Sequence, residues 1–310
     1  MPVHLCRVCG SQQSSLVKPR SIDRQLEPDD LRISDSRYGV TLELWRCAEC
    51  GFIYAPENDV VELEGLYERL TDPGYTESQE SRILQMRWLL KNAIEHRPNA
   101  SNLLDIGAGT GLLVREAATL GLDAIGVEPS SWLVEQAREA NGVELVRGVY
   151  PHPSLEGRRF DLVLLVDVIE HVADPVALLD ACRAALAPGG LMVVVTPDVS
   201  SAASKLLGNR WWHYRLAHVG YFDRRSFARA AAVAGLAPRR WLRAKWFFQV
   251  RYLADRTSRY LPTAWLNRLA ERTAPLRWCY DRVVPLNLFD SYVVFLTDKE
   301  ELPSDSRNRK

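Results

Sequence analysis

The chain has 310 residues, of which 47% are hydrophobic and 25% are charged, so it is long enough to bury a substantial core. Lys plus Arg and Asp plus Glu balance at 39 each, which excludes a global field that would attract nucleic acid or an acidic polymer. No apolar run approaches the roughly 20 residues that cross a bilayer, and the first residues lack the apolar core of a signal peptide. We therefore expect a cytoplasmic protein.

Two cysteine pairs share one pattern within residues 1–60. Each pair places two thiols three residues apart with a glycine after the second thiol, at Cys6 and Cys9 and again at Cys47 and Cys50. Four thiolates complete a tetrahedral zinc site with no open position, so the metal is structural. We predict a zinc ribbon over residues 1–60, with a redox dithiol pair or another metal as the alternatives.

The charge of this first segment bears on its role. Residues 1–60 hold seven Lys or Arg against nine Asp or Glu, which is the wrong sign for a surface that binds phosphates. We therefore expect no nucleic-acid partner, and a docking or substrate-covering role for the ribbon.

The middle of the chain changes its hydrophobic period. Residues 61–98 show helical spacing and end at Pro98, which predicts a helical cap or linker. From residue 99 to 238, short apolar runs alternate with helical patterns. Strands that are apolar on both faces and alternate with helices indicate a parallel sheet covered on both sides, with ligands beyond the carboxyl ends of its strands.

The first of these apolar runs ends in the stretch LLDIGAGTG. Gly107, Gly109 and Gly111 allow a tight turn that approaches a ligand closely. A nicotinamide dinucleotide would place its pyrophosphate beside Asp105, and the last glycine of its fingerprint is replaced by Leu112. Both features disfavour a dinucleotide. S-adenosylmethionine has no phosphate and carries an ammonium and a sulfonium, so it would gain from Asp105.

The second apolar run supports the same ligand. It ends at Glu128, 23 residues after Asp105, where a carboxylate can accept hydrogen bonds from both hydroxyls of a ribose. The alternative is an ordinary solvated glutamate at the end of a strand.

Five stretches in order along the chain carry a family resemblance. LLDIGAGTG, GVEPS, FDLVLLVDVIEHVADP, LAPGGLMVVVTP and HVGYF resemble the successive motifs of class I S-adenosylmethionine-dependent methyltransferases. More narrowly, the chain is similar to small-molecule methyltransferases of bacterial biosynthetic pathways that carry an N-terminal zinc ribbon. The resemblance implies an α/β fold with a Rossmann-like sheet of seven strands, whose last strand, in residues 286–298, is antiparallel.

The resemblance also implies a set of cofactor residues. The glycine turn would surround the methionine end of the cofactor, Glu128 would bind its ribose, and the segment after the third strand would flank its adenine. The residues implied are Asp105, Gly107, Gly109, Gly111, Glu128, Pro129, Gly148, Val149 and Asp167.

Methyl transfer from a sulfonium requires alignment of the acceptor and, for a protonated acceptor, removal of its proton. His171 and His218 are the candidate bases, and the alternatives are holding a loop and packing. The candidate substrate residues are Tyr75, Arg82, Trp212, His213 and Tyr221, for whose aromatic members plain packing is the alternative.

Residues 239–285 combine basic and aromatic side chains. From Arg239 to Arg282, eleven Lys or Arg stand against three Asp or Glu, between Trp, Phe, Tyr and Leu. The spacing predicts a helical insertion of two amphipathic helices before the closing strand. It is compatible with a lid or homodimer surface, with peripheral contact to anionic lipid, or with a dock for an anionic substrate. The polar residues 299–310 are expected to be disordered.

These expectations combine into one functional hypothesis. The chain is expected to transfer a methyl group from S-adenosylmethionine to a small biosynthetic metabolite, such as a sugar, a polyketide-like or a lipid-linked intermediate. The alternative is a non-catalytic module that binds the cofactor or recruits partners on the same fold.

Overall fold

A seven-stranded sheet forms the centre of the computed structural model, which describes residues 4–34, 37–76, 79–258 and 274–300. Its strand order is β10-β13-β8-β7-β4-β5-β6. The strands are β4 (Asn102–Ile106), β5 (Asp123–Glu128), β6 (Val146–Arg147), β7 (Phe160–Val166), β8 (Leu186–Pro197), β10 (Leu236–Arg243) and β13 (Ser291–Asp298). β13 is antiparallel to both of its neighbours, β8 and β10. The predicted α/β fold with an antiparallel last strand is confirmed.

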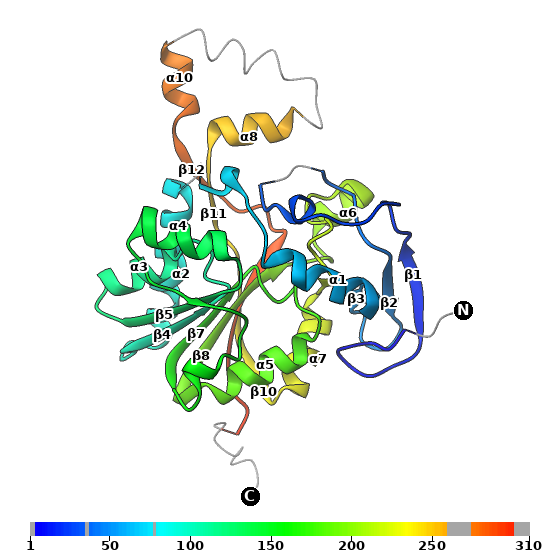
Figure 1. The fold of residues 1–310 in the computed structure, drawn as a ribbon, viewed down its shortest axis with the longest axis horizontal. Coiled ribbons are helices and arrows are strands. Elements are labelled where there is room, and N and C mark those ends of the chain that lie inside the picture. Colours follow the sequence, from blue (N-terminus) through cyan, green and yellow to red (C-terminus); the bar gives the residue numbers. More distant parts are fainter. Residues whose placement is uncertain (1–3, 35–36, 77–78, 259–273, 301–310) are drawn as a thin grey trace, which may run out of the picture.

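Helices cover both faces of this sheet (Figure 1). One set is α2 (Gln79–His96) and α3 (Leu112–Thr119), and the other is α5 (Pro175–Ala184) and α7 (Arg224–Val233). Along β4, Leu103 packs with the α2 and α3 side chains, whereas Leu104 packs with those of α5 and α7. Successive side chains of a strand point to opposite faces, so a strand buried on both faces must be apolar throughout.

Further helices and 3-10 turns precede or connect these strands. They are α1 (Glu57–Tyr67), α4 (Ser131–Asn141), α6 (Ala202–Leu207) and the 3-10 turns η1 (Pro28–Leu31), η2 (Pro73–Thr76), η3 (Pro153–Leu155) and η4 (Gly208–Arg210). Two of the helices begin at strong caps. The Asp174 side chain accepts hydrogen bonds from the amides of Val176 and Ala177 at the start of α5. Ser130 caps α4, two residues after Glu128. These caps fix where the loops after β7 and β5 end.

The N-terminal segment shares a second sheet with the core. Its strands are β1 (Ser14–Lys18), β2 (Leu44–Cys47) and β3 (Ile53–Tyr54), and the fourth strand, β9 (Gly220–Tyr221), comes from the loop region after β8. Phe52 packs against Phe222 with ring centroids 4.6 Å apart. β9 covers the edge of β3, which would otherwise expose unpaired backbone groups. The described part of the N-terminal segment is therefore joined to the core through β9.

The basic aromatic segment differs from the expectation at its start. Residues up to Arg243 belong to β10, so the insertion begins after residue 243 and not at residue 239. Trp241 packs against Tyr292 on one face of the sheet, and Leu242 joins the hydrophobic cluster on the other. This alternation is the period of a strand, whereas a run of basic and aromatic residues as short as this one also fits a helical period.

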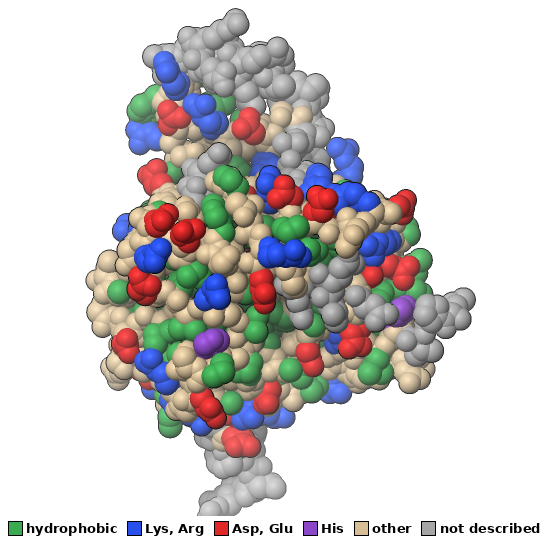
Figure 2. Space-filling view, viewed as in Figure 1, with side chains coloured by type: hydrophobic (Ala, Val, Ile, Leu, Met, Phe, Trp, Pro, Cys, Tyr) green, Lys and Arg blue, Asp and Glu red, His purple; other side chains and the backbone are tan. Residues whose placement is uncertain are grey.

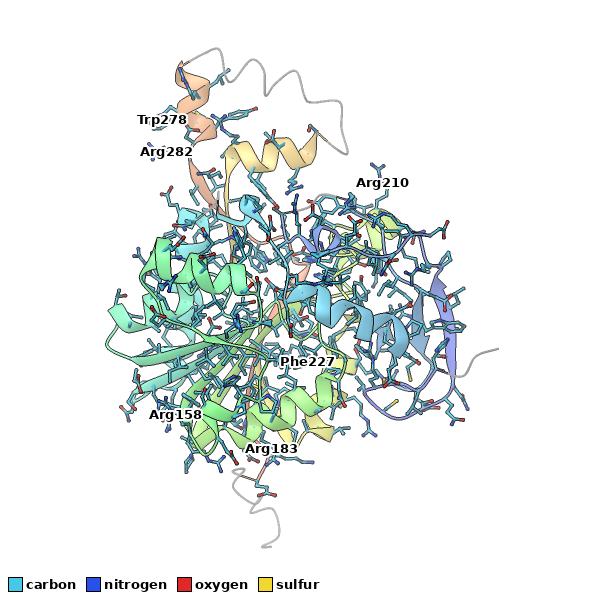
Figure 3. All side chains as sticks on the ribbon, in the orientation of Figure 1. Arg158, Arg183, Arg210, Phe227, Trp278 and Arg282 are labelled. Carbon is cyan, nitrogen blue, oxygen red and sulfur yellow. The ribbon has the colours of Figure 1, made fainter. Side chains whose placement is uncertain are left out.

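Beyond β10, the insertion projects from the body of the molecule (Figures 1 and 3). β11 (Trp246–Gln249) and β12 (Val283–Leu286) pair as an antiparallel stem. Helix α8 (Val250–Thr257) follows β11, and helix α10 (Ala274–Tyr280) precedes β12. Trp278 on α10 is 61% exposed. The part of the predicted helices in residues 259–273, and most of the predicted tail, at 301–310, lie outside the described residues.

On the face drawn in Figure 2, acidic and basic side chains are interspersed. Within the described ranges, none of the helices has the length and apolar character needed to cross a membrane.

Phe52→Ala is expected to destabilise the whole molecule, because Phe52 is 1% exposed and joins the N-terminal sheet to the central core. We expect a loss of about 3–5 kcal/mol in the free energy of unfolding, in one transition, measured by denaturant titration. Leu206→Ala is the control, since Leu206 is 87% exposed and should change this free energy by less than about 0.5 kcal/mol. Two separate transitions for the wild type would contradict this shared core.

Candidate functional site

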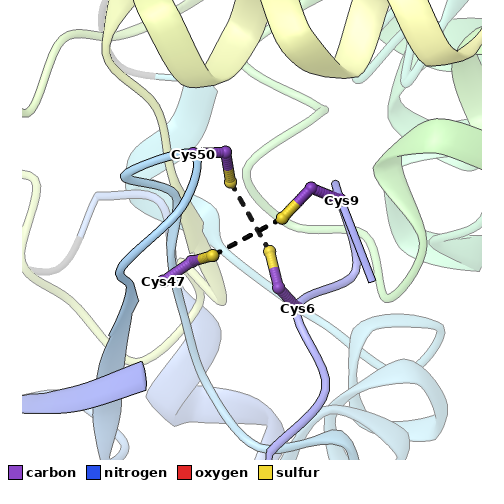
Figure 4. A group of neighbouring side chains, drawn as sticks. All are labelled: Cys6, Cys9, Cys47 and Cys50. Atoms are coloured by element: carbon purple, nitrogen blue, oxygen red, sulfur yellow. Dashed lines mark hydrogen bonds between the residues drawn. The ribbon is translucent and has the colours of Figure 1, made fainter. Parts of the chain in front are cut away.

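The four predicted thiols meet at one point (Figure 4). The Sγ atoms of Cys6 and Cys50 are 3.6 Å apart and those of Cys9 and Cys47 are 3.5 Å apart, and all four lie within 4.8 Å of one another. None of these cysteines is in a disulfide. Sulfurs bound to one tetrahedral zinc at about 2.3 Å lie about 3.8 Å from each other. The donor set therefore fits a structural zinc ion, which would hold the two loops together.

Arg7, between the first two cysteines, connects this cluster to the core. Its guanidinium donates hydrogen bonds to the carbonyl oxygens of Ala173 at 2.6 Å and Val219 at 3.0 Å. Ala173 follows the loop that carries His171, and Val219 follows His218. The cysteine loop thus braces both histidine-bearing segments. No sequence pattern predicts this role, because a single arginine in a Cys-x-x-Cys loop has no characteristic signature.

The glycine turn lies where β4 ends. The amides of Gly107 and Ala108 both donate to the carbonyl of Val127 on β5, which ties the turn to the neighbouring strand. Gly107 has a φ of 72°, and a Cβ there would lie 2.5 Å from a methyl of Val168. Glycine is therefore required at this position both by the backbone conformation and by the close approach.

Glu128 sits across this turn with its carboxylate almost completely buried. Its Oε2 accepts a hydrogen bond from the amide of Gly109 at 2.9 Å, and its Oε1 accepts one from the amide of Ser130 at 2.8 Å. Burial raises the pKa of Glu128 to about 7, against the opposing effect of the two amides. Each carboxylate oxygen has a second lone pair, so two further donors can still bind.

Asp105, at the carboxyl-terminal side of β4, is buried beside Glu128. Burial, followed by repulsion from the Glu128 charge, raises the pKa of Asp105 well above its usual range. Two carboxyl groups held this close in the protein interior favour a cationic or hydrogen-bond-donating ligand between the strand ends. The structure thus brings together the two acids that were predicted from separate strands.

Tyr75 and Arg82 lie over the glycine turn. The Tyr75 hydroxyl lies 2.7 Å from the place that a Cβ on Gly109 would take. The guanidinium carbon of Arg82 is 3.4 Å from the centroid of the Tyr75 ring. Both residues come from the segment between the N-terminal sheet and β4, so this segment covers the predicted cofactor residues rather than a separate substrate surface.

The predicted adenine side is more open. The Gly148 amide donates to the backbone carbonyl of Glu128 at 3.0 Å, while the Val149 side chain is 64% exposed. Pro129 is half-buried between Glu128 and Ser130. These residues stand at the ends of β5 and β6, on the edge of the same site.

Asp167 follows β7 with a φ of 54°, in the left-handed region that non-glycine residues rarely adopt. Its Oδ1 is buried without a hydrogen-bond partner. Burial raises the pKa of Asp167 to about 6, while His213 and Arg82 act in the opposite direction. An uncommon backbone conformation together with an unsatisfied buried oxygen is typical of a ligand-binding site.

Three histidines lie close together, and one of them, His213, interacts electrostatically with Asp167. The ring of His171 lies edge-on to that of His218, with centroids 4.7 Å apart, and His213 is stacked on His218 at 5.9 Å. Burial lowers the pKa of His171 to about 4, and burial lowers the pKa of His218 well below its usual value. Both imidazoles are therefore neutral at physiological pH and are weak proton acceptors.

Asp290 was not predicted as a site residue, because it stands at the edge of the closing strand in a run that was assigned to the sheet. It is 1% exposed, and its Oδ2 accepts hydrogen bonds from Trp212 Nε1 at 2.7 Å and His213 Nε2 at 3.1 Å. The predicted substrate residues Trp212 and His213 are thus held by one buried carboxylate.

Tyr221 is placed differently from these residues. It is 2% exposed, lies in β9 and packs with the hydrophobic cluster of the N-terminal segment. Its hydroxyl donates to the carbonyl of Arg215 at 3.4 Å. This geometry assigns Tyr221 to packing within that cluster, which is the alternative given for the aromatic residues.

The fold and the site together define a class I methyltransferase. The family model described as "Methyltransferase domain" matches residues 78–240, which is more than half of the chain. The chain belongs to this family of S-adenosylmethionine-dependent methyltransferases.

Curated relatives are similar over a shorter stretch. A ubiquinone biosynthesis O-methyltransferase from Cereibacter sphaeroides is 42% identical over 119 residues, which are 35% of this chain and 47% of that protein. A protein of the same name from Bradyrhizobium sp. is 38% identical over 122 residues, covering 38% and 44%. The chain thus spans about half the length of the curated relatives it matches.

Among solved structures, an S-adenosylmethionine-dependent methyltransferase from Clostridium acetobutylicum aligns with 70% of this chain and 91% of its own. The sequence identity is 11% and the TM-score is 0.46.

Cys47→Ser is expected to remove one equivalent of zinc per chain and to lower the melting temperature, because a structural zinc supplies folding free energy. Metal analysis and calorimetry would measure both effects. The control is Cys279→Ser, which replaces an exposed cysteine and should change neither quantity. Equal zinc contents in Cys47→Ser and the wild type would exclude the thiol cluster as the zinc site.

Proposed function

We propose that this chain transfers the methyl group of S-adenosylmethionine to a hydroxyl oxygen of a small biosynthetic metabolite. The observation that carries the proposal is the buried pair Asp105 and Glu128 around the glycine turn, in a chain of the methyltransferase family. The O-methyltransferase names of the relatives support oxygen as the acceptor atom. We propose a sugar, a polyketide-like or a lipid-linked intermediate as the substrate class.

The residues present fit the cofactor by their chemistry. Asp105 would meet its ammonium group, and the remaining lone pairs of Glu128 would accept hydrogen bonds from the ribose hydroxyls. Both interactions favour the ionised carboxylates, whose burial is otherwise costly. Gly148 and Val149 would flank the adenine, while Tyr75 and Arg82 would cover the bound cofactor and exclude water.

The bound cofactor would supply a methyl group already activated by the positive sulfur. The protein then has to hold the acceptor oxygen in line and remove its proton. We propose His213 for the proton. Its Nε2 is bound to the buried Asp290, which leaves Nδ1 as the acceptor and offsets the positive charge formed on the ring. Its neighbours His171 and His218 would line the acceptor pocket as neutral groups.

Titration calorimetry with S-adenosylmethionine, followed by a labelled-methyl screen of phenols, sugars and lipid-linked hydroxyl compounds, tests the proposal. Glu128→Ala should weaken cofactor binding roughly 5- to 150-fold, because the ribose hydroxyls lose their acceptor. The control is Glu139→Ala, an exposed acid on α4, which should bind the cofactor as the wild type does. Absence of binding by folded, zinc-loaded wild type would refute the proposed activity. Binding without transfer to any acceptor would favour a non-catalytic module.

Cofactor binding is expected to release protons near neutral pH. Glu128, with a pKa of about 7, is partly protonated in the free protein, and Asp105 has a raised pKa. A cationic, hydroxyl-bearing ligand favours the ionised forms, so the affinity should rise as the pH increases from 6 to 8. Calorimetry in buffers with different ionisation enthalpies measures the released protons. Glu128→Gln should reduce the release, and proton uptake on binding would contradict the assignment.

A further inference from the structure

A second group of metal-ligating side chains lies apart from the thiols. Glu170, His171 and His218 each offer one ligand atom, and these atoms lie within 4.8 Å of one another. Glu170 and His171 come from the loop after β7, whereas His218 comes from the segment before β9. The tertiary fold therefore brings the His218 imidazole to the adjacent Glu170 and His171, which lie 48 and 47 positions earlier in the chain.

Two of the three side chains, Glu170 and His171, are oriented by a hydrogen bond at the other polar atom. His171 Nδ1 donates to the carbonyl of Ala217 at 2.7 Å, which leaves the lone pair on Nε2. Glu170 Oε2 accepts from the hydroxyl of Thr196 at 3.0 Å. Such outer partners fix the ring tautomers and point the free atoms of metal ligands inward. The His218 ring lies edge-on to the His171 ring, with centroids 4.7 Å apart.

The atoms that remain are buried and unsatisfied. Glu170 Oε1 and His218 Nδ1 have no hydrogen-bond partner, and their residues are 2% and 5% exposed. A buried polar atom without a partner costs about 1–3 kcal/mol, so two of them beside each other call for a ligand. Plain packing of histidines does not account for a carboxylate oxygen left without a donor in the same cluster.

We propose that Glu170, His171 and His218 bind a divalent first-row transition-metal ion, separate from the zinc ion of the thiol cluster. Two imidazole nitrogens with one carboxylate oxygen are typical of zinc, iron(II) and manganese(II) sites that keep positions open for substrate. Ligand atoms on one such ion lie about 3 Å apart, so small side-chain rotations would close the present spacing.

The site lies next to the proposed cofactor. The Tyr67 phenol interacts electrostatically with both Glu128 and Glu170. Its ring centroid is 6.3 Å from that of His171. An ion at this place would bind the hydroxyl oxygen of the acceptor and lower its pKa, so that the proton passes to His213 as the oxygen–methyl bond forms and the sulfur–methyl bond breaks. This role rests on the proposed function, but metal binding itself does not.

Manganese(II) is the probe that separates the two sites, because thiolates select zinc and the hard manganese ion prefers nitrogen and oxygen ligands. The full chain, zinc-loaded at the thiols, is dialysed against manganese(II) without cofactor or substrate. Metal analysis should find about one manganese per chain, and electron spin-echo spectroscopy should show coupling to imidazole nitrogen. Parallel dialysis against zinc and iron(II) identifies the ion bound most tightly.

Glu170→Gln and His218→Asn should each weaken manganese binding at least about tenfold while one zinc per chain is retained. His96→Gln is the matched control, since His96 is an imidazole on α2 outside the cluster and should leave binding unchanged. Wild type that binds no manganese, zinc or iron(II) beyond the thiol zinc would overturn the proposal, as would unchanged affinity in both ligand variants. Methyl transfer is assayed separately, so failure of metal binding is distinguishable from failure of the methyltransferase activity.

Discussion

The burial of carboxyl groups at the carboxyl-terminal edge of the parallel sheet is the constraint on which the site depends. Asp105 and Glu128 lie in the last residues of β4 and β5, Asp167 and Glu170 follow β7, and burial raises the pKa of each one. A folded chain tolerates this cost only when the surrounding structure is strongly stabilised elsewhere or a ligand compensates the charge. Burial of the apolar strands on both faces of the sheet stabilises the fold. The buried acids make the site selective for ligands that donate hydrogen bonds or carry positive charge.

The N-terminal segment contacts the loops at this edge of the sheet. β9 joins β3, and Arg7 holds the carbonyls next to the two histidine-bearing segments. A metal in the thiol cluster would therefore do more than stabilise a small appendage, because the loop it fixes also braces the loops of the site. Tyr75 and Arg82 belong to the same covering layer, and they reach the glycine turn from the connection between β3 and β4.

The sequence predicted the parts that depend on local pattern. Runs that are apolar at successive positions predicted the parallel strands, the closely spaced glycines predicted the turn after β4, and the Cys-x-x-Cys pairs predicted the thiol cluster. Each of these patterns is encoded by neighbouring residues. The pattern failed at the end of β10, where residues 239–243 belong to a strand and not to the predicted helical insertion, because a short run of basic and aromatic residues fits both periods. Asp290 and Arg7 were missed for a different reason. Their roles come from hydrogen bonds to residues 77 or more positions away, and no local spacing encodes these contacts.

By itself, the sequence determined the class of fold, the acids at the strand ends and the likeness to methyltransferases, because strand and turn chemistry repeat within short windows. Only the tertiary structure decided which side chains meet. In the fold, β3 of the N-terminal segment pairs with β9, and Tyr221 packs in a hydrophobic cluster. His213 is hydrogen-bonded to Asp290, and Glu170 and His171 lie close to His218. The physical reason is that convergence of side chains depends on how loops from distant strands pack against each other, and the free energy of that packing is shared across the whole core.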